Sequence, residues 1–266
     1  MSAGEYARLL QPLAELVAAA GHRILTTAAP DLLPRAKADR SLVTTADEAS
    51  EAILCEGLAR ILPGVPVIAE EGIAAGELPE CDGEFFLVDP LDGTREFLSG
   101  RPEYAVNLAL VSEGVPKIGL IYAPASGVLY AGSEGSAVRA ALPPGAVFDR
   151  AKATPIRVRP RPARLVVAVS RSHPDPATDR FLATLAIERR LVMGSALKFA
   201  SIAEGHADVY PRLVSLSEWD VAAGHALVVA AGGSMQATDD EALRYGALAR
   251  NFRLGGFIAW GGPPAA

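Results

Sequence analysis

The chain has 266 residues, of which 50% are hydrophobic and 21% are charged, so it can bury a sizeable core and has the composition of an ordinary globular protein. Its formal net charge is −6, and no run of lysines and arginines is long enough to track a nucleic acid, which argues against nucleic acid as a partner.

The cysteines and the apolar segments argue against several further classes of protein. Cys55 and Cys81 lack the spacing of a zinc site, and a single disulfide would be an unusual scaffold in a chain of this size, so we expect two free thiols. Charged residues between Glu5 and Glu15 interrupt the N-terminal apolar pattern, and no signal peptide is expected. No uncharged apolar run reaches the ~18 residues of a membrane span. The expected location is cytoplasmic, and peripheral association with the inner membrane is compatible with the sequence.

The first two predicted elements are helices joined by a loop. Leucines and alanines at helical spacing predict a helix over residues 9–20 that ends near Gly21. Residues 30–47 are rich in proline and charge, which indicates an exposed loop leading into a second helix that runs to Leu58 and is capped by Thr44 or Thr45. Asp47 falls in the first turn of that helix, where a carboxylate complements the helix dipole or has a functional role.

Two short strands each deliver carboxylates at their C-terminal ends. The strand at 67–69 ends on Glu70 and Glu71, and the buried strand at 85–88 ends on Asp89-Pro90-Leu91-Asp92-Gly93-Thr94. Asp92 is a natural N-cap, which would leave the backbone N–H groups of Gly93 and Thr94 free to bind an anion such as phosphate. Two carboxylates beside a phosphate cradle suggest metal-assisted phosphate chemistry.

The middle of the chain predicts an antiparallel meander and then a change of domain. Strands are expected at 104–111, 118–122 and 128–131, with short turns between them. The proline-rich, basic stretch 152–162 is the clearest shift in composition, and we place a domain boundary near residue 145. This gives an N-terminal α+β domain, 1–145, and a C-terminal α/β domain, 146–266.

The second half alternates strands and helices. A buried, parallel-type strand at 164–170 leads into Arg171-Ser172-His173, helices are expected at 178–186, 196–204 and 221–231, and strands at 191–193 and 207–210. Ser195 is expected as the N-cap of the helix at 196–204, with Lys198 in its first turn. Lys198 either extends to solvent or faces a bound anion.

Asp220 stands just before the last of these helices. Ser217 and Asp220 match a capping box, and a carboxylate in a first helical turn can also face a metal ion, so the two roles are compatible.

Three of these motifs together resemble a known family. Glu70-Glu71, the stretch from Asp89 to Thr94, and Trp219-Asp220-Val221-Ala222-Ala223-Gly224 resemble, in order and spacing, the signatures of the lithium-sensitive, magnesium-dependent inositol monophosphatase superfamily. Four stretches resemble its bacterial 3'(2'),5'-bisphosphate nucleotidase branch, namely 88–97, 170–173, 194–199 and 203–212. Leu42, where relatives often have proline, departs from the pattern but lies outside the ligand set.

The resemblance implies a fold and a set of roles. The fold would be α/β, a layered α-β-α-β-α sandwich with the site in the crevice between its halves. Two or three Mg²⁺ ions would be held by Glu70, Asp89, the Leu91 carbonyl, Asp92 and Asp220. Asp47 and Thr94 would orient and deprotonate the attacking water. The substrate would contact Glu70, Leu91, Asp92, Gly93, Thr94, His173, Ser195, Lys198, Arg212 and Asp220, with Arg212 near the second phosphate.

The resulting expectation is an enzyme that removes the 3'-phosphate from adenosine 3',5'-bisphosphate, giving AMP and phosphate. Its partner would be a small phosphorylated nucleotide. An inositol monophosphatase or a sugar bisphosphatase would share the same metal cluster and differ in the loops of the second half of the chain, which line the substrate pocket. A non-catalytic phosphate-ligand or RNA-associated regulatory protein with this fold is the alternative from another class, which the intact carboxylate set and the absence of a basic patch disfavour.

Overall fold

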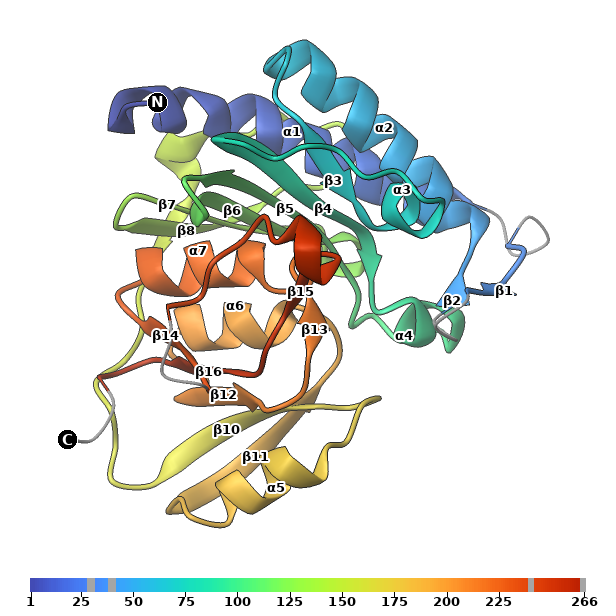
Figure 1. The fold of residues 1–266 in the computed structure, drawn as a ribbon. Coiled ribbons are helices and arrows are strands. Elements are labelled where there is room, and N and C mark those ends of the chain that lie inside the picture. The colour runs from blue at the N-terminus through green and yellow to red at the C-terminus, as the bar shows by residue number, and fades with distance from the viewer. Residues whose placement is uncertain (28–31, 38–41, 239–241, 264–266) are drawn as a thin grey trace.

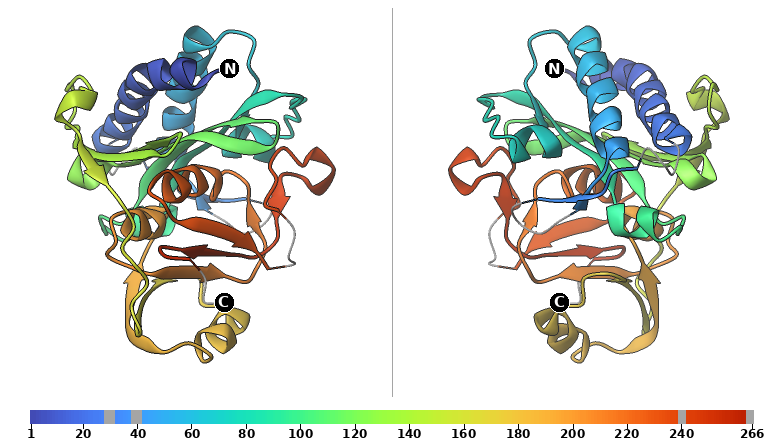
Figure 2. Two further views of the ribbon diagram at one scale, coloured as in Figure 1. Left: turned by 90° about the vertical axis from the view of Figure 1, so that its left-hand side faces the viewer. Right: turned by 90° about the vertical axis from the view of Figure 1, so that its right-hand side faces the viewer.

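The computed structural model describes residues 1–27, 32–37, 42–238 and 242–263. Its elements stack in five layers, helix, sheet, helix, sheet and helix, as Figure 1 and the side views of Figure 2 show. The expected α/β layered sandwich is therefore confirmed. None of the helices in the described part of the chain combines the length and the apolar character that a bilayer span requires.

The first sheet has seven strands in the order β3-β4-β5-β6-β7-β8-β9. Its strands are β3 Val67–Ala69, β4 Glu84–Asp92, β5 Ala105–Ser112, β6 Val115–Ala123, β7 Val128–Ser133, β8 Ser136–Ala141 and β9 Thr154–Ile156. β3 and β4 are parallel, and every later neighbour is antiparallel. The predicted meander is confirmed, because these strands follow one another in chain order through short turns.

Two long helices, α1 Ala3–Thr26 and α2 Thr45–Ile61, cover one face of this sheet (Figure 1). The predicted end of α1 near Gly21 is wrong. An ideal Cβ on Gly21 would lie 2.5 Å from the Tyr122 ring of β6, so this glycine allows the helix to approach the sheet closely and does not end it. A similar close approach joins the two helices, since a Cβ on Gly57 of α2 would lie 2.2 Å from the Leu16 side chain.

The middle layer consists of α6 Leu197–Ala203 and α7 Ala222–Ala230, packed between the two sheets (Figure 1). Glycines on the first sheet make room for α7. A Cβ on Gly119 of β6 would lie 2.2 Å from the Ala223 carbonyl oxygen, and one on Gly132 of β7 would lie 2.6 Å from Leu227 Cα. This contact joins the halves of the chain through a common core.

The second sheet has five strands in the order β11-β10-β12-β16-β14, and α5 Pro176–Leu182 forms the outermost layer. Its strands are β10 Leu165–Ser170, β11 Ile187–Met193, β12 Val209–Arg212, β14 Ser234–Ala237 and β16 Phe257–Trp260. β10 is parallel to both of its neighbours, as its continuous apolar run predicted.

Short elements surround the crevice between these layers. They are β1 Arg35–Ala36, β2 Leu42–Val43, α3 Glu70–Ala74, α4 Thr94–Leu98, β13 Leu216–Ser217 and β15 Arg253–Leu254, together with the 3₁₀ turns Pro124–Ser126, Arg150–Lys152 and Leu248–Arg250. β1 and β2 form a small antiparallel hairpin within the stretch predicted as a loop. Residues 30–31 and 38–41 of that predicted loop lie outside the described residues.

Several boundaries differ from the prediction. The two N-cap residues are the clearest cases: Gly93 rather than Asp92 precedes α4, and Ala196 rather than Ser195 precedes α6. Asp92 still belongs to β4 because it pairs with Ala105 of β5, which keeps its backbone extended. Cys55 and Cys81 are free thiols, as expected. The division at residue 145 stays a prediction, and the first sheet takes its last strand from β9 beyond it.

Candidate metal and phosphate site

A cavity of about 730 Å³ opens in the crevice where the two sheets and the middle helices meet. Residues of both halves line it, from the ends of β3 and β4 on one side to the starts of α6 and α7 on the other. Because these segments are far apart in sequence, the cavity exists only once both halves have packed together.

Three carboxylates come together on its wall. Glu70, Asp89 and Asp220 each place one oxygen so that all three oxygens lie within 4.8 Å of one another. Glu70 and Asp89 are neighbours because β3 and β4 are parallel and Ala69 lies opposite Val88. The next residue along each strand, Glu70 or Asp89, therefore lies at the same edge of the sheet. Asp220 arrives from the turn before α7, where its side chain also accepts a hydrogen bond from the Ser217 N–H at 3.1 Å.

This cluster is electrostatically unfavourable without a cation. Burial raises the pKa of Asp89 well above its ordinary value, and the charges of Glu70 and Asp92 raise it further. The pKa of Asp220 is raised for the same reasons, burial first and then Glu70 and Asp92. A multivalent cation with a preference for oxygen would remove the repulsion.

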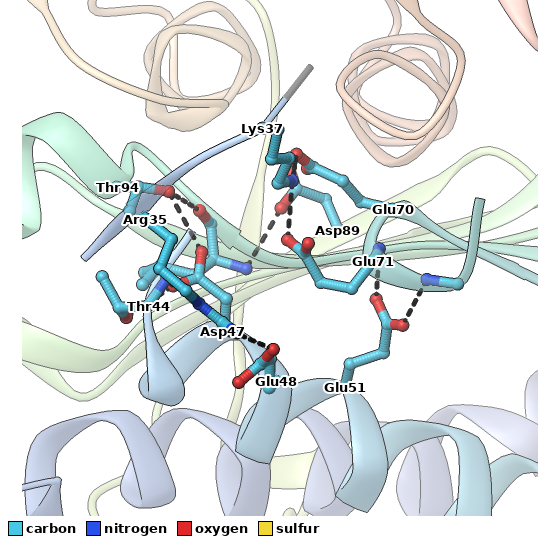
Figure 3. A network of polar contacts seen from close by, with 12 residues as sticks. Arg35, Lys37, Thr44, Asp47, Glu48, Glu51, Glu70, Glu71, Asp89 and Thr94 are labelled. Atoms are coloured by element: carbon cyan, nitrogen blue, oxygen red, sulfur yellow. Dashed lines mark hydrogen bonds and ion pairs between the residues drawn. The ribbon is translucent and has the colours of Figure 1, made fainter. Parts of the chain in front are cut away.

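A lysine that the sequence did not single out approaches the same carboxylates. Lys37 Nζ lies 2.5 Å from Glu70 Oε1 and 2.8 Å from Glu71 Oε1 (Figure 3). Burial lowers the pKa of Lys37, but Glu70 and Glu71 more than offset this and raise it overall. The sequence did not predict this contact, because a single lysine in a polar loop has no pattern that marks it as a partner of Glu70 and Glu71.

Asp92 is held from both halves of the molecule. Its Oδ2 accepts from Asn107 Nδ2 at 3.2 Å and from the backbone N–H of Ala196. Asn107 Oδ1 is a buried oxygen without a hydrogen-bond partner in the described part of the structure, and a hydrated cation beside Asp92 would supply a donor. The all-oxygen donor set and this unpaired acceptor both fit Mg²⁺.

Asp47 and Thr94 form a hydrogen-bonded pair beside the cluster (Figure 3). Thr94 Oγ1 lies 3.1 Å from Asp47 Oδ1 and 3.2 Å from the Leu91 carbonyl oxygen. Asp47 Oδ2 accepts from the N–H and the hydroxyl of Thr44, the N-cap of α2, at 2.8 and 2.6 Å. Asp47 therefore caps the helix with one oxygen and faces Thr94 with the other. Burial raises its pKa, and the Thr44 hydrogen bonds lower it in part.

The turn after Asp92 allows a close approach of the backbone. Gly93 has φ +95°, and an ideal Cβ there would lie 3.1 Å from the Glu103 carbonyl oxygen, so a side chain would be both strained and crowded. Thr94 opens α4 directly after it. Phosphate binding by the Gly93 and Thr94 amides stays a prediction.

The remaining predicted contacts lie across the cavity. His173, Ser195, Lys198 and Arg212 all line it. Lys198 is only 4% exposed and its Nζ donates to the Ser195 carbonyl oxygen, so the expectation that it could extend to solvent is wrong. Burial lowers its pKa to about 8 although Asp92 opposes the shift. Arg212 Nη1 donates to the His173 carbonyl oxygen at 2.5 Å, which joins two of the expected substrate residues.

Comparison with known proteins agrees with this geometry. The sequence pattern of the inositol monophosphatase family matches residues 5–256. The chain is 40% identical over 209 residues to the 3'(2'),5'-bisphosphate nucleotidase CysQ of Salmonella typhimurium, covering 79% of this chain and 81% of that protein. It is 38% identical over 255 residues to the CysQ of Buchnera aphidicola, and this match covers 95% of this chain and 93% of that protein.

The chain belongs to the inositol monophosphatase family.

The same family appears among solved structures. CysQ from Bacteroides thetaiotaomicron, described as a bacterial member of the inositol monophosphatase family, superposes with a TM-score of 0.76 at 33% identity, covering 96% of this chain and 99% of that one. Another relative, 32% identical over 200 residues, is the histidinol-phosphatase of Chlorobaculum parvum, with 74% of this chain and 73% of that protein covered.

In this member of the inositol monophosphatase family, nearly all the predicted site residues share one cavity. Glu70, Asp89, Leu91, Asp92, Gly93, Thr94 and Asp220 line it together with the four substrate residues named above. Asp47 does not line the cavity but stands behind Thr94. Lys37, Asn107 and Glu103 contact these residues and had no signal in the sequence.

Proposed function

We propose that this protein is a Mg²⁺-dependent phosphatase that removes the 3'-phosphate from adenosine 3',5'-bisphosphate and releases AMP. One observation supports the chemistry above all others, the convergence of Glu70, Asp89 and Asp220 within 4.8 Å. The similarity to nucleotidases at 38–40% identity over most of the chain supports the choice of substrate.

The proposed metal ligands are Glu70, Asp89, the Leu91 carbonyl, Asp92 and Asp220, and two or three Mg²⁺ ions would share them. Bound there, Mg²⁺ would supply positive charge that polarises the phosphate and favours ionisation of the attacking water. Inhibition by Li⁺, which the family resemblance implies, is part of this proposal and is tested by titrating Li⁺ against activity at fixed Mg²⁺.

Asp47 and Thr94 are the proposed proton acceptors. Thr94 Oγ1 can take a proton from the attacking water only as its own proton moves to Asp47, which lies within hydrogen-bonding distance. The bonds from Thr44 fix the Asp47 carboxylate in place, so its free oxygen stays directed at Thr94. The water oxygen then forms a new bond to phosphorus, the bond from phosphorus to the 3'-oxygen breaks, and the leaving 3'-oxygen takes a proton from solvent water to become the 3'-hydroxyl of AMP.

The second-half loops are proposed to select a nucleotide. Arg212, Lys198 and His173 give this end of the cavity cationic and hydrogen-bonding groups, suited to a second phosphate and a ribose. Ser195 adds a hydroxyl beside Lys198. A mononucleotide-sized product would remain in this end of the cavity after the 3'-phosphate leaves.

A substrate panel tests the proposal. Phosphate release would be measured with adenosine 3',5'-bisphosphate, inositol 1-phosphate, fructose 1,6-bisphosphate and histidinol phosphate, each with Mg²⁺ and with a chelator. We expect kcat/KM for the bisphosphate nucleotide to exceed the others by more than about tenfold, or ~1.4 kcal/mol. Equal rates would reject the substrate assignment, and absence of Mg²⁺-dependent release from every compound would favour a non-catalytic role.

A further inference from the structure

Two loops carry proposed nucleotide contacts, and both loops form hydrogen bonds with the side chain of one glutamate, Glu103. The β10–α5 loop, residues 171–175, carries His173, and the β11–α6 loop, residues 194–196, carries Ser195. Glu103 precedes β5 in the first half of the chain. Its carboxylate reaches across the crevice to both loops.

The contact with the β10–α5 loop is a bidentate ion pair. Arg171 Nε donates to Glu103 Oε2 and Arg171 Nη2 to Glu103 Oε1, each at 2.7 Å. The pKa of Glu103 is lowered, first by these bonds, so the carboxylate is ionised at neutral pH. Paired, planar geometry of this kind fixes orientation as well as distance.

The contact with the β11–α6 loop comes from the same carboxylate. Glu103 Oε2 accepts the backbone N–H of Gly194 at 3.1 Å. The main chain packs there too, since a Cβ on Gly194 would lie 2.7 Å from the Glu103 carbonyl oxygen. That carbonyl also faces Gly93, so Glu103 touches the turn proposed to bind phosphate and the two loops proposed to bind the nucleoside.

Arg171 extends the connection to the end of β11. Its Nη2 donates to the Val192 carbonyl oxygen at 2.9 Å, and its backbone N–H donates to the Met193 carbonyl oxygen at 3.0 Å. The two loops are thus joined to each other and, through Glu103, to the first half. In the described part of the structure, the Glu103 side chain pairs with Arg171 and Gly194 and forms no hydrogen bond or ion pair with the clustered carboxylates Glu70, Asp89 and Asp220.

We propose that Glu103 is a positioning residue that sets the affinity for the nucleoside part of the substrate. It does so by holding both loops against its own segment, which lies beside the turn at Gly93 and Thr94 proposed to bind phosphate. The proposal rests on the nucleotidase function proposed above. Releasing the loops would weaken ground-state binding of the nucleoside and leave the metal and phosphate chemistry intact. Such a loss raises KM with little change in kcat.

The experiment compares Glu103→Ala, Glu103→Gln and Arg171→Gln with the wild type. For each, KM and kcat are measured with adenosine 3',5'-bisphosphate, and Ki is measured for inorganic phosphate, which needs only the metal side of the cavity. We expect Glu103→Ala to raise KM about tenfold, with kcat and the Ki of phosphate each within about twofold of wild type.

The other variants separate the two contacts. Glu103→Gln keeps an acceptor for Gly194, and Arg171→Gln leaves that acceptor untouched, so each should raise KM less than Glu103→Ala does. The double variant Glu103→Ala/Arg171→Gln should match Glu103→Ala within about twofold, because Glu103→Ala already removes the ion pair and the second change removes in addition only the hydrogen bond from Arg171 to the Val192 carbonyl oxygen. The matched control is Asp179→Asn, which breaks an exposed ion pair with Arg190 in the second half of the chain. It should leave KM, kcat and the Ki of phosphate unchanged.

Two results would overturn the proposal. One is an unchanged KM in Glu103→Ala. The other is an equal rise in KM and in the Ki of phosphate, which would indicate a general structural role. If Glu103→Ala does not fold, Glu103→Gln decides by the same criteria. A wild type without preference for the nucleotide would instead reject the proposed function, so the two failures are distinguishable.

Discussion

Asp92 illustrates how this site divides the oxygens of one side chain between structure and chemistry. Asn107 and the Ala196 N–H both bind Oδ2, so Oδ1 is the oxygen that can serve a cation. Burial raises the pKa of Asp92, and the charge of Lys198 opposes that rise. The carboxylate is therefore held in one orientation by uncharged donors from both halves before any ion binds.

Replacing Asp92 by Asn should abolish turnover without unfolding the protein. The amide keeps the size of the side chain but removes a negative charge, and loss of several kcal/mol of charge stabilisation corresponds to a fall in kcat of about a thousandfold or more. Phosphate release and the thermal unfolding midpoint are measured together. Full activity in this variant would refute the metal assignment.

A pair of substitutions at Thr94 separates its hydroxyl from its shape. Thr94→Ser keeps the hydroxyl beside Asp47, and we expect kcat to stay within about tenfold of wild type. Thr94→Val keeps the branched shape without the proton path, and kcat should fall about 10²- to 10⁴-fold. Similar losses in both variants would contradict the proposed relay.

The contact between α6 and α7 depends on a missing side chain. An ideal Cβ on Gly224 of α7 would lie 2.1 Å from the Phe199 ring of α6, and Phe199 also stacks on Phe257 of the second sheet with ring centroids 5.4 Å apart. The ring therefore packs against both Phe257 and Gly224. Asp220 lies in the turn directly before α7, so this packing also fixes one member of the acidic cluster.

Gly224→Ala should lower the free energy of unfolding by about 1–3 kcal/mol, because the new methyl group must displace Phe199 or the helix. Chemical denaturation measures the change. Gly4→Ala is the matched control, since nothing lies within 4 Å of a Cβ there, and a helical alanine should stabilise the protein by about 0.5–1 kcal/mol. Equal effects of the two substitutions would contradict the packing argument.

His225 in α7 gives the fold a dependence on pH. Its Nδ1 lies 3.0 Å from the Tyr245 hydroxyl oxygen, and burial lowers its pKa to about 4. The unfolded chain takes up a proton near pH 6.5 whereas the folded protein does so only near pH 4. The unfolded state thus binds more protons between these values, and stability falls as the pH drops through that window.

This loss should approach about 3 kcal/mol at pH 4, from ~1.4 kcal/mol for each unit of pKa shift. His225→Gln cannot titrate, so the difference between the wild-type and variant unfolding free energies should change by that amount between pH 7 and pH 4. Comparing the two curves cancels the carboxylates that titrate in the same range. Parallel curves would show that His225 does not carry the effect.

Across the whole molecule, the acidic cluster connects the two halves, since Glu70 and Asp89 belong to the first sheet and Asp220 to the turn before α7. Ions that bind only this assembled cluster stabilise the folded state. At a free Mg²⁺ concentration of about 100 Kd, one site should add ~2.7 kcal/mol to the unfolding free energy. This increase should be much smaller in Asp220→Asn. Calorimetry of the wild type and the variant, each with Mg²⁺ and with a chelator, measures it. An equal increase in the wild type and the variant would contradict a cation site to which Asp220 contributes.

Local patterns in the sequence were enough to predict much of this protein. Apolar periodicity predicted the meander, the buried strand β10 and most helices, and the motifs around Glu70, Asp89 and Asp220 placed the family correctly. Each of these signals lies within a few consecutive residues, because backbone geometry and hydrophobic periodicity act over short distances. Helix ends were less predictable, as Gly21 and Ser195 illustrate.

The tertiary structure decided which side chains meet. Lys37 beside Glu70, Asn107 behind Asp92 and Glu103 across the two loops are pairs separated by 15 to 91 residues, and no local pattern marks them. Sequence patterns report which face of an element is buried, but the partner across a crevice depends on how sheets and helices pack. That packing is a property of the whole chain, because it is set by the close approaches at glycines such as Gly119 and Gly224.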